Sequence, residues 1–263
     1  MYAIERNRII RKYLKEHGQA QVHALSDLLG VSEVTIRRDL EKLESDGWLT
    51  RTHGGAVLNA VEVVDPLLEA LDGSEDDEEA LDEIASLALR LVEDGDVIML
   101  TNGPVNVRLS ARLEERSGLT VLTNDVTAAL RISLHEANRA VLIGGDMDNA
   151  EKAIFGSMAL ANLRRFYVKK LFVEVDGVND SLQLTVNTQD KADLILGAFE
   201  LADQSVVVCP SSRFSHSAFF RLGDVRIVDG IITNTDLNDD YKSRIFSSDV
   251  PLYTTVAAFE GST

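Results

Sequence analysis

The sequence predicts an α/β chain of two unequal domains: a small N-terminal module of helices with a short β-hairpin, and a larger C-terminal domain with a mainly parallel sheet. Apolar residues recur at helical spacing through residues 4–45. The segment WLTRTHGGAV that follows contains two short extended runs and a glycine pair, which is typical of a hairpin. From residue 81, strand-like apolar runs alternate with amphipathic helical segments, the pattern of a parallel sheet covered on both faces.

We place the N-terminal domain at residues 1–57, a linker at 58–80 and the C-terminal domain at 81–263. The linker contains Pro66, Gly73 and an acidic run from Glu75 to Glu79, a composition typical of a connecting segment. We interpret the acidic run as the solvated start of the next helix rather than as a binding tail.

Composition excludes several classes of protein. The sequence lacks the eighteen-residue apolar run of a transmembrane helix, and its charged N-terminus lacks the apolar core of a signal peptide. The single cysteine, Cys209, excludes an intrachain disulfide and a cysteine metal cluster, and His135 and His216 have no metal-ligand spacing around them. We therefore expect a cytoplasmic protein with no cofactor and no metal site.

The net charge of −17 is unfavourable for contact with nucleic acid, but it is unevenly distributed. Residues 1–57 carry nine basic and eight acidic side chains, a net charge of +1, so the remainder of the chain carries −18. Any contact with DNA is therefore expected through the N-terminal domain alone, and its strength should depend on salt.

Three helices are expected in the N-terminal domain, at about Ile4–His17, at Val22–Leu29, and from Glu33 to a stop at Gly47. Gly30 supplies the tight turn, because glycine adopts positive φ without strain, and Ser32 is a good N-cap for the third helix. The residues expected to form the small core are Ile9, Ile10, Tyr13, Leu14, Leu25, Leu28 or Leu29, Val31, Ile36, Leu40 and Leu43, with Trp48 and Leu49 anchoring the hairpin.

This order of helix, tight turn, helix and basic hairpin indicates a winged helix-turn-helix that binds DNA. In such a module the second helix of the pair presents its N-terminal side chains to base edges, and the hairpin, or wing, lies on the sugar-phosphate backbone. Arginine can pair with guanine O6 and N7, and we expect Asp39 and Glu41 to orient the arginines. Gly54 and Gly55 should permit close approach to DNA. Each residue alone also fits an ordinary surface, and it is the combined order and spacing that favours DNA binding. The candidate DNA-binding residues are Ser32, Glu33, Thr35, Arg37, Arg38, Arg51, Thr52, His53 and Gly54.

The C-terminal domain begins with an amphipathic helix over 81–94 that ends near Gly95. A strand over 96–101, a polar loop over 102–106 and a helix over 107–115 follow. Further strands are expected over 119–124, 139–145, 169–177, 204–210 and 230–234, with helices over 125–134 and 191–202.

The stretch VSEVTIRRDLEKLESDGWLTRTHGGAV resembles the DeoR family of bacterial-type transcriptional regulators, for which TIRRDL followed by L-x-R-x-H-G-G-A is a specific signature. The resemblance continues through VEDGDVIML, LTVLTN, LIGG, VDGV and SSRF, and so covers almost the whole chain. It implies a repressor of carbohydrate catabolic genes that acts on operator DNA as a dimer or tetramer. It also implies that the C-terminal domain resembles sugar-phosphate isomerases and senses a phosphorylated sugar.

The resemblance places the effector near the loop after the first strand of the C-terminal domain, where the family has D-S-G-T-T-T, a cradle for phosphate. Here Pro104 has no N–H and Val105 has no hydroxyl, so the cradle is weakened. The family's Lys-Arg pair is replaced by Ile195 and Leu196, and an acidic residue by Pro210, while Asp146 and Asp148 add negative charge after the glycine pair. The candidate effector-binding residues are Thr101, Asn102, Gly103, Asn106, Asn124, Gly144, Gly145 and Arg213.

Three explanations of these departures stay open: a less anionic effector, a degenerate domain that mainly oligomerises, or an anion held by another arginine, such as Arg108 or Arg213. The leading hypothesis is a metabolite-controlled, sequence-specific DNA-binding regulator, and not an enzyme. The alternatives are an effector-independent regulator and a sugar-phosphate isomerase-like enzyme. The enzyme would need a carboxylate base, such as Asp146 or Asp176, beside an anion clamp.

Overall fold

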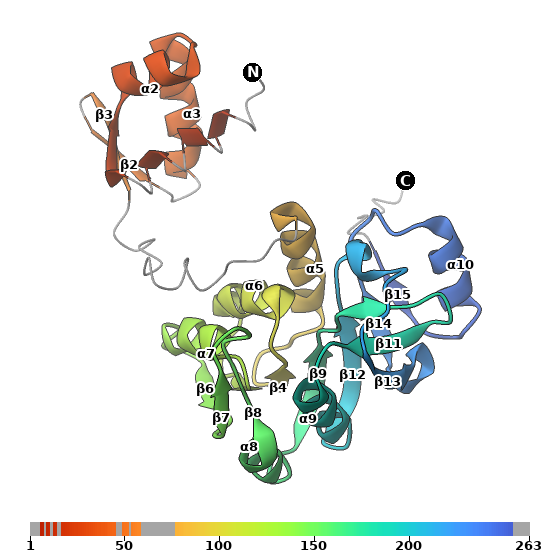
Figure 1. Cartoon of the computed structure of the whole chain (residues 1–263). Coiled ribbons are helices and arrows are strands. Elements are labelled where there is room, and N and C mark those ends of the chain that lie inside the picture. The colour runs from red at the N-terminus through yellow and green to blue at the C-terminus, as the bar shows by residue number, and fades with distance from the viewer. Residues whose placement is uncertain are drawn as a thin grey trace, which may run out of the picture. The chain divides into compact units, whose positions relative to one another are not determined.

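The structure is a computed structural model, and it describes residues 6–7, 9–10, 13–14, 17–45, 49–52, 54–58 and 77–254. The chain divides into two compact units, residues 1–70 and 71–263, which are described separately below (Figure 1). Trp48, His53 and the expected helix stop at Gly47 lie outside the described residues, as does most of the expected linker.

The N-terminal unit has the elements of a winged helix. The described residues between 6 and 17 are helical, and a short strand begins after Gly18. Helix α2 (Val22–Leu29) ends at Gly30, whose φ of 62° confirms the predicted left-handed turn. Helix α3 spans Glu33–Ser45, and the backbone N–H of Thr35 donates to Ser32 Oγ at 3.3 Å, which confirms Ser32 as its cap.

A three-stranded antiparallel sheet completes this unit, in the order β1 (Gln19–Gln21), β3 (Gly55–Leu58) and β2 (Leu49–Thr52). The hairpin of β2 and β3 was predicted from the sequence. Strand β1 was not, because three residues between two helices carry no alternating pattern that could be recognised. Its pairing with β3 joins the helices to the wing.

The core of the N-terminal unit contains the residues expected from helical spacing, including Ile10, Leu14, Ile36, Leu40 and Leu43, each at most 1% exposed. Of the two leucines left open by the sequence, Leu29 is buried and Leu28 is 55% exposed. Ile9, Tyr13 and Val31 are partly buried against this core.

The C-terminal unit is built on a seven-stranded sheet in which every pair of neighbouring strands is parallel (Figure 1). This confirms the predicted α/β class with a parallel sheet. In spatial order the strands are β15 (Leu252–Tyr253), β14 (Gly230–Ile232), β12 (Ala202–Val208), β9 (Val168–Val173), β4 (Val97–Leu100), β5 (Thr120–Thr123) and β6 (Arg139–Leu142).

Helices cover both faces of this sheet, because alternate strand residues point to opposite sides. Ile98 and Leu100 pack into one buried cluster, together with apolar residues of α5 (Glu78–Arg90), α6 (Pro104–Arg112) and α7 (Val126–Ser133). Met99 packs into the other cluster, on the opposite face, with residues of α8 (Gly156–Leu163), α9 (Gln189–Phe199) and α10 (Asp239–Phe246). The result is a three-layer α/β/α domain.

Several smaller elements were not predicted. An antiparallel hairpin joins β7 (Asp146–Asp148) to β8 (Ala153–Phe155), and a separate sheet has the order β10 (Gly177–Val178), β11 (Gln183–Val186) and β13 (Phe220–Asp224). They are two to five residues long, so the alternation that marks a strand is weak in the sequence. Within the described residues, no helix is both long and apolar enough to cross a membrane.

Two helix starts differ from the expected positions. Helix α5 begins at Glu78, inside the segment assigned to the linker, and Asp77 caps it by accepting from the N–H of Glu79, in agreement with the interpretation of the acidic run as a helix start. Helix α6 begins at Pro104 rather than Val107, because proline at the first helical position needs no N–H partner. The polar loop after β4 is therefore also the first turn of a helix.

Candidate nucleic-acid interface and sensor site

The exposed surface of α3 carries most of the candidate DNA-binding side chains. Ser32, Glu33, Arg37 and Arg38 are exposed, and Thr35 is partly exposed. The hydroxyl groups of Ser32 and Thr35 lie 3.0 Å apart, and Arg37 forms an exposed ion pair of 3.4 Å with Glu33 one turn earlier. Since Ile36, Leu40 and Leu43 fix the opposite face of α3 in the core, these polar groups have a defined direction on a rigid element.

The wing arginine is held against the recognition helix. Arg51 of β2 donates from Nη1 to Glu41 Oε1 at 2.5 Å, and its backbone N–H donates to Glu44 Oε1 at 2.9 Å. Thr52 and Gly54 of the wing are exposed. Glu41 therefore orients an arginine, but this arginine is Arg51 of the wing.

Asp39 has a role that the sequence analysis assigned incorrectly. It is 8% exposed, and its two carboxylate oxygens accept from Arg6 Nε at 2.8 Å and Arg6 Nη2 at 3.1 Å. The hydrogen bonds from this guanidinium to Asp39 raise the pKa of Arg6. Asp39 thus ties the first helix to α3, and it was expected to orient the arginines of the interface.

The two wing glycines also differ in role. A Cβ at Gly54 would meet no atom within 4 Å, whereas a Cβ at Gly55 would lie 2.0 Å from the carbonyl oxygen of Ala20. The missing side chain of Gly55 therefore permits β3 to pair with β1, a role that the sequence did not predict. Gly54 remains open, as expected for a residue at the wing tip.

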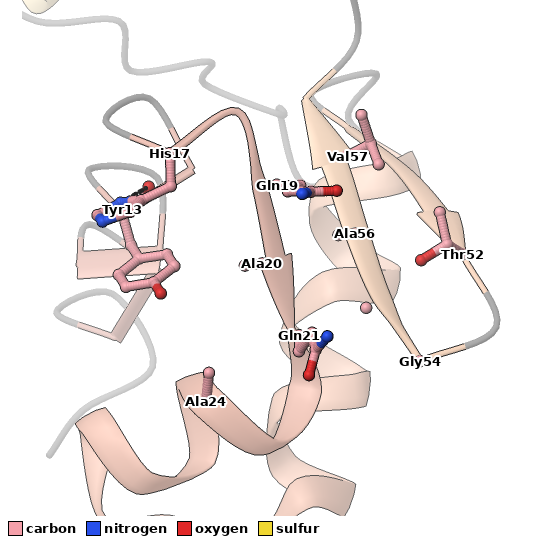
Figure 2. A pocket seen from close by; sticks show the side chains of 11 residues that line it. Tyr13, His17, Gln19, Ala20, Gln21, Ala24, Thr52, Gly54, Ala56 and Val57 are labelled. Carbon is pink, nitrogen blue, oxygen red and sulfur yellow. Dashed lines mark hydrogen bonds between the residues drawn. The ribbon is translucent and has the colours of Figure 1, made fainter.

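A groove of about 670 Å³ lies between the first helix, β1 and the wing. Figure 2 shows Tyr13 and His17, whose rings stack with centroids 4.1 Å apart, on one side, and Thr52 and Val57 of the wing on the other. Among the described residues, its lining comes from these elements and from Ala24 of α2, and not from α3. The groove is therefore distinct from the candidate base-reading surface.

In the C-terminal unit, five candidate effector residues meet where β4 and β5 end. Thr101, Asn102, Asn106 and Asn124 are at most 1% exposed, and Gly103 lies between them in the loop. The N–H of Asn102 donates to Asn124 Oδ1 at 2.9 Å, and Asn106 Nδ2 donates to the carbonyl oxygens of Thr101 and Phe172. These hydrogen bonds support the loop itself, whereas Asn106 Oδ1 is buried without a hydrogen-bond partner among the described residues.

Three acidic residues approach the same loop, and the sequence analysis did not assign any of them to it. Asn102 Nδ2 donates to Glu151 at 2.9 Å, the N–H of Gly103 donates to Asp125 at 3.4 Å, and the N–H of Asn106 donates to Glu174 at 3.2 Å. Glu174 follows β9 and is 4% exposed. The position of Glu174 directly after an apolar run was the sequence signal that could have assigned it to this loop.

A buried basic residue pairs with Asp176, which lies two residues after Glu174 in the chain. Lys191, in the first turn of α9, donates to Asp176 Oδ1 at 2.7 Å, and the other oxygen of Asp176 accepts from the N–H of Asn187 at 2.7 Å. The side chains of Lys191 and Asp176 are 5% and 17% exposed. Ile195 and Leu196, of the same helix, are the residues that replace the family's Lys-Arg pair. In the structure Ile195 is buried in the core and Leu196 lies on a surface groove beside α8.

The remaining candidates lie on other strands. Gly144 and Gly145 follow β6 at one edge of the sheet. A Cβ at Gly145 would lie 2.6 Å from the carbonyl oxygen of Phe155, so Gly145 serves the packing of the β7–β8 hairpin. Arg213 belongs to a short 3₁₀ helix (Ser211–Arg213) after β12, a strand that β9 separates from β4.

A winged helix with exposed arginines and a wing, joined in one chain to a three-layer α/β domain with a polar cluster at its strand ends, defines a DNA-binding transcriptional regulator with a sensor domain. The chain belongs to the DeoR family. The DeoR-like helix-turn-helix domain matches residues 6–62, and the DeoR C terminal sensor domain matches residues 77–235.

The chain matches proteins that are named as regulators of transcription, and each match covers nearly the whole length of the relative. The lactose phosphotransferase system repressor of Lactococcus lactis is 32% identical over 87% of this chain and 89% of that protein. The transcriptional repressor GlcR of Bacillus subtilis is 27% identical over 89% of each chain. The transcriptional regulator GlpR of Haloferax volcanii is 28% identical over 98% of this chain and all of that protein.

Solved structures with a similar arrangement are more distant. Ribose 5-phosphate isomerase A of Methanocaldococcus jannaschii is 19% identical, with a TM-score of 0.40 over 53% of this chain and 55% of that one. The eIF2B delta subunit of Chaetomium thermophilum is 20% identical, with a TM-score of 0.45 over 67% of this chain and 64% of that one.

Proposed function

We propose that this regulator is a repressor of genes for carbohydrate uptake or catabolism and that a small metabolite bound by its sensor domain weakens its hold on operator DNA. Support for repression and for sugar-related genes comes from the relatives, two of which are named repressors, one of a lactose phosphotransferase system. The observation that carries the proposal is the winged helix, whose α3 exposes Arg37 and Arg38 next to its capped N-terminus.

In the proposed complex, α3 lies in the major groove and Arg37 and Arg38 contact base edges or phosphates, while Arg51, Thr52 and Gly54 follow the backbone beside the groove. His53 would act with the wing. Operators of such modules are repeated, so we propose that the protein binds as a dimer or tetramer. Since its target is chromosomal DNA, we propose that it acts in the cytoplasm.

The proposed effector site is the set of strand ends around Thr101, Asn102, Gly103, Asn106 and Asn124. Binding there would control DNA affinity by linkage: a metabolite that prefers the arrangement of subunits with low operator affinity shifts the population toward it. We propose no catalytic role, because both oxygens of Asp176, one of the two candidate bases, accept hydrogen bonds from Lys191 and Asn187.

The test starts with genomic DNA fragments retained by the purified full-length protein, sequenced to define the operator. Titration of that operator in a gel-shift assay, with and without a panel of free and phosphorylated sugars, then measures affinity and its control. A specific operator whose affinity falls at least about fivefold with one sugar is expected, a typical allosteric coupling. Retention of DNA without sequence preference would contradict the proposal.

A further inference from the structure

The β4–α6 loop of the sensor domain receives a carboxylate from its own chain at the start of a helix. The first N–H groups of an α-helix have no partner within the helix and carry partial positive charge, so they are a natural position for an anion. In α6, the N–H of Asn106 donates to Glu174 Oε2 at 3.2 Å. Glu174 comes from the end of β9, 68 residues further along the chain.

Packing fixes this carboxylate against the loop. A Cβ on Gly103 would lie 2.3 Å from Cδ of Glu174 and within 2.6 Å of both its oxygens, so only glycine permits the carboxylate to sit here. The N–H of Glu174 itself donates to Thr101 Oγ1 at 2.9 Å, which ties the backbone of Glu174 to the same loop. Glu174 is 4% exposed, so the position is closed to bulk water.

Two further donors of the loop also face carboxylates. Gly103 N–H faces Asp125 and Asn102 Nδ2 faces Glu151, while Pro104 has no N–H to offer. An incoming phosphate would therefore have to displace internal carboxylates from donors that they already occupy, and would add its own negative charge beside theirs.

We propose that Glu174 is a specificity-determining residue of the sensor site: its carboxylate fills the anion position of α6 and restricts this site to uncharged effectors, such as a free sugar or polyol, in place of a phosphate ester. This inference depends on the proposed sensor function for the class of ligand. The occupation of the anion position can be tested without it.

The test is thermal unfolding of the full-length protein at constant ionic strength, in sodium chloride, sodium formate or inorganic phosphate. Glu174→Ala removes the internal carboxylate and leaves a space that formate or phosphate can fill. We expect formate and phosphate to raise the Tm of this variant by about 2–4 °C above its value in chloride, as a ligand bound well above its Kd does for a domain of this size.

Two matched variants separate anion binding from general effects of salt and cavities. Glu174→Gln retains the volume and an acceptor for Asn106 N–H, and Val173→Ala opens an apolar cavity at the last residue of β9, next to Glu174 in the chain. For the wild type and for each control, we expect the Tm to be the same in chloride, formate and phosphate. If Glu174→Ala is unfolded in chloride, folding in formate supports the proposal and failure to fold in formate contradicts it.

Equal stabilisation of the wild type and Glu174→Ala by phosphate would overturn the proposal, as would a Glu174→Ala protein that responds to neither anion. The result is independent of the proposed function, because operator binding by the wild type is measured in a separate titration. If the wild type binds no operator but formate and phosphate stabilise Glu174→Ala, repression is refuted, and the conclusion that Glu174 fills the anion position of α6 still holds.

Discussion

Arg37 and Arg38 stand exposed on α3 of the winged helix, whereas Lys170 and Lys191 of the sensor domain are buried and paired with acidic side chains. The same kinds of charge are thus available to a partner in one domain and used internally in the other. Exposed charges contribute little to stability and can contribute much to recognition. Buried pairs mostly matter when they are broken, because the remaining charge has no water to solvate it.

The largest expected effect comes from breaking an internal pair of the sensor domain. Lys191→Met leaves Asp176 without its cation in a site where the side chains are 5% and 17% exposed, and should lower the free energy of unfolding by about 3 kcal/mol. Urea denaturation measures this. Lys242→Met is the matched control, because Lys242 pairs with an Asp239 that is 95% exposed, and it should change stability by less than about 0.5 kcal/mol. Equal effects of the two substitutions would show that the burial of Lys191 has no energetic consequence.

The next effect concerns the internal geometry of the DNA-binding domain. Gly55→Ala places a methyl group 2.0 Å from the Ala20 carbonyl oxygen, so β1 and β3 must separate, at a cost of about 2–3 kcal/mol. Gly54→Ala meets no atom within 4 Å and serves as the control for the wing. Circular dichroism melts should distinguish them. A stable Gly55→Ala protein would mean that the pairing of β1 with β3 is dispensable.

Recognition by the exposed arginines should respond without loss of stability. Arg38→Ala is expected to weaken operator binding by about 2 kcal/mol, a value within the range for an arginine that contacts a base edge. The Tm of the variant should stay unchanged. Arg165→Ala removes an exposed arginine from the sensor domain and should leave operator affinity unaffected. A gel-shift titration that finds the same affinity for both variants rules out a DNA contact by Arg38.

The last prediction concerns pH and Asp96, whose titration lies well below neutral pH. Burial alone would raise the pKa of this carboxyl, but hydrogen bonds from Lys169, Lys170 and the N–H of Glu93 lower it from 3.8 to about 2. The stabilisation by the ionised form is therefore complete above pH 4 to 5 and is lost as pH falls from 3.8 toward 2. Acid titration of unfolding free energy should show this loss, and Asp96→Asn, which cannot titrate, should show a flatter profile in that window.

Much of the winged helix could be read from the sequence, because its signals are local. The bounds of α2, the left-handed turn at Gly30 and the Ser32 cap depend on residues within a few positions of one another. The hydrophobic spacing of Ile36, Leu40 and Leu43 likewise defines which face of α3 is buried. The exposed face of α3 is then the opposite one, and it is the candidate interface with DNA.

The sequence also indicated the parallel sheet of the sensor domain and the loop after β4, through alternation of apolar strands with helices. It did not place Glu174 beside that loop, nor did it pair Lys191 with Asp176. The neighbours of a strand end depend on strand order, and β9 inserts between β4 and β12 although it follows β4 by about 70 residues.

By itself, then, the sequence determined the class of each domain, the Ser32 cap, the turn at Gly30 and the candidate surface for DNA, because periodicity and capping act over one or two helical turns. Only the tertiary structure decided that Arg6 pairs with Asp39, that Gly55 serves β1, and that the carboxylate of Glu174 fills the start of α6. Each of these contacts joins residues more than thirty positions apart, and chain folding alone brings such residues within hydrogen-bonding distance.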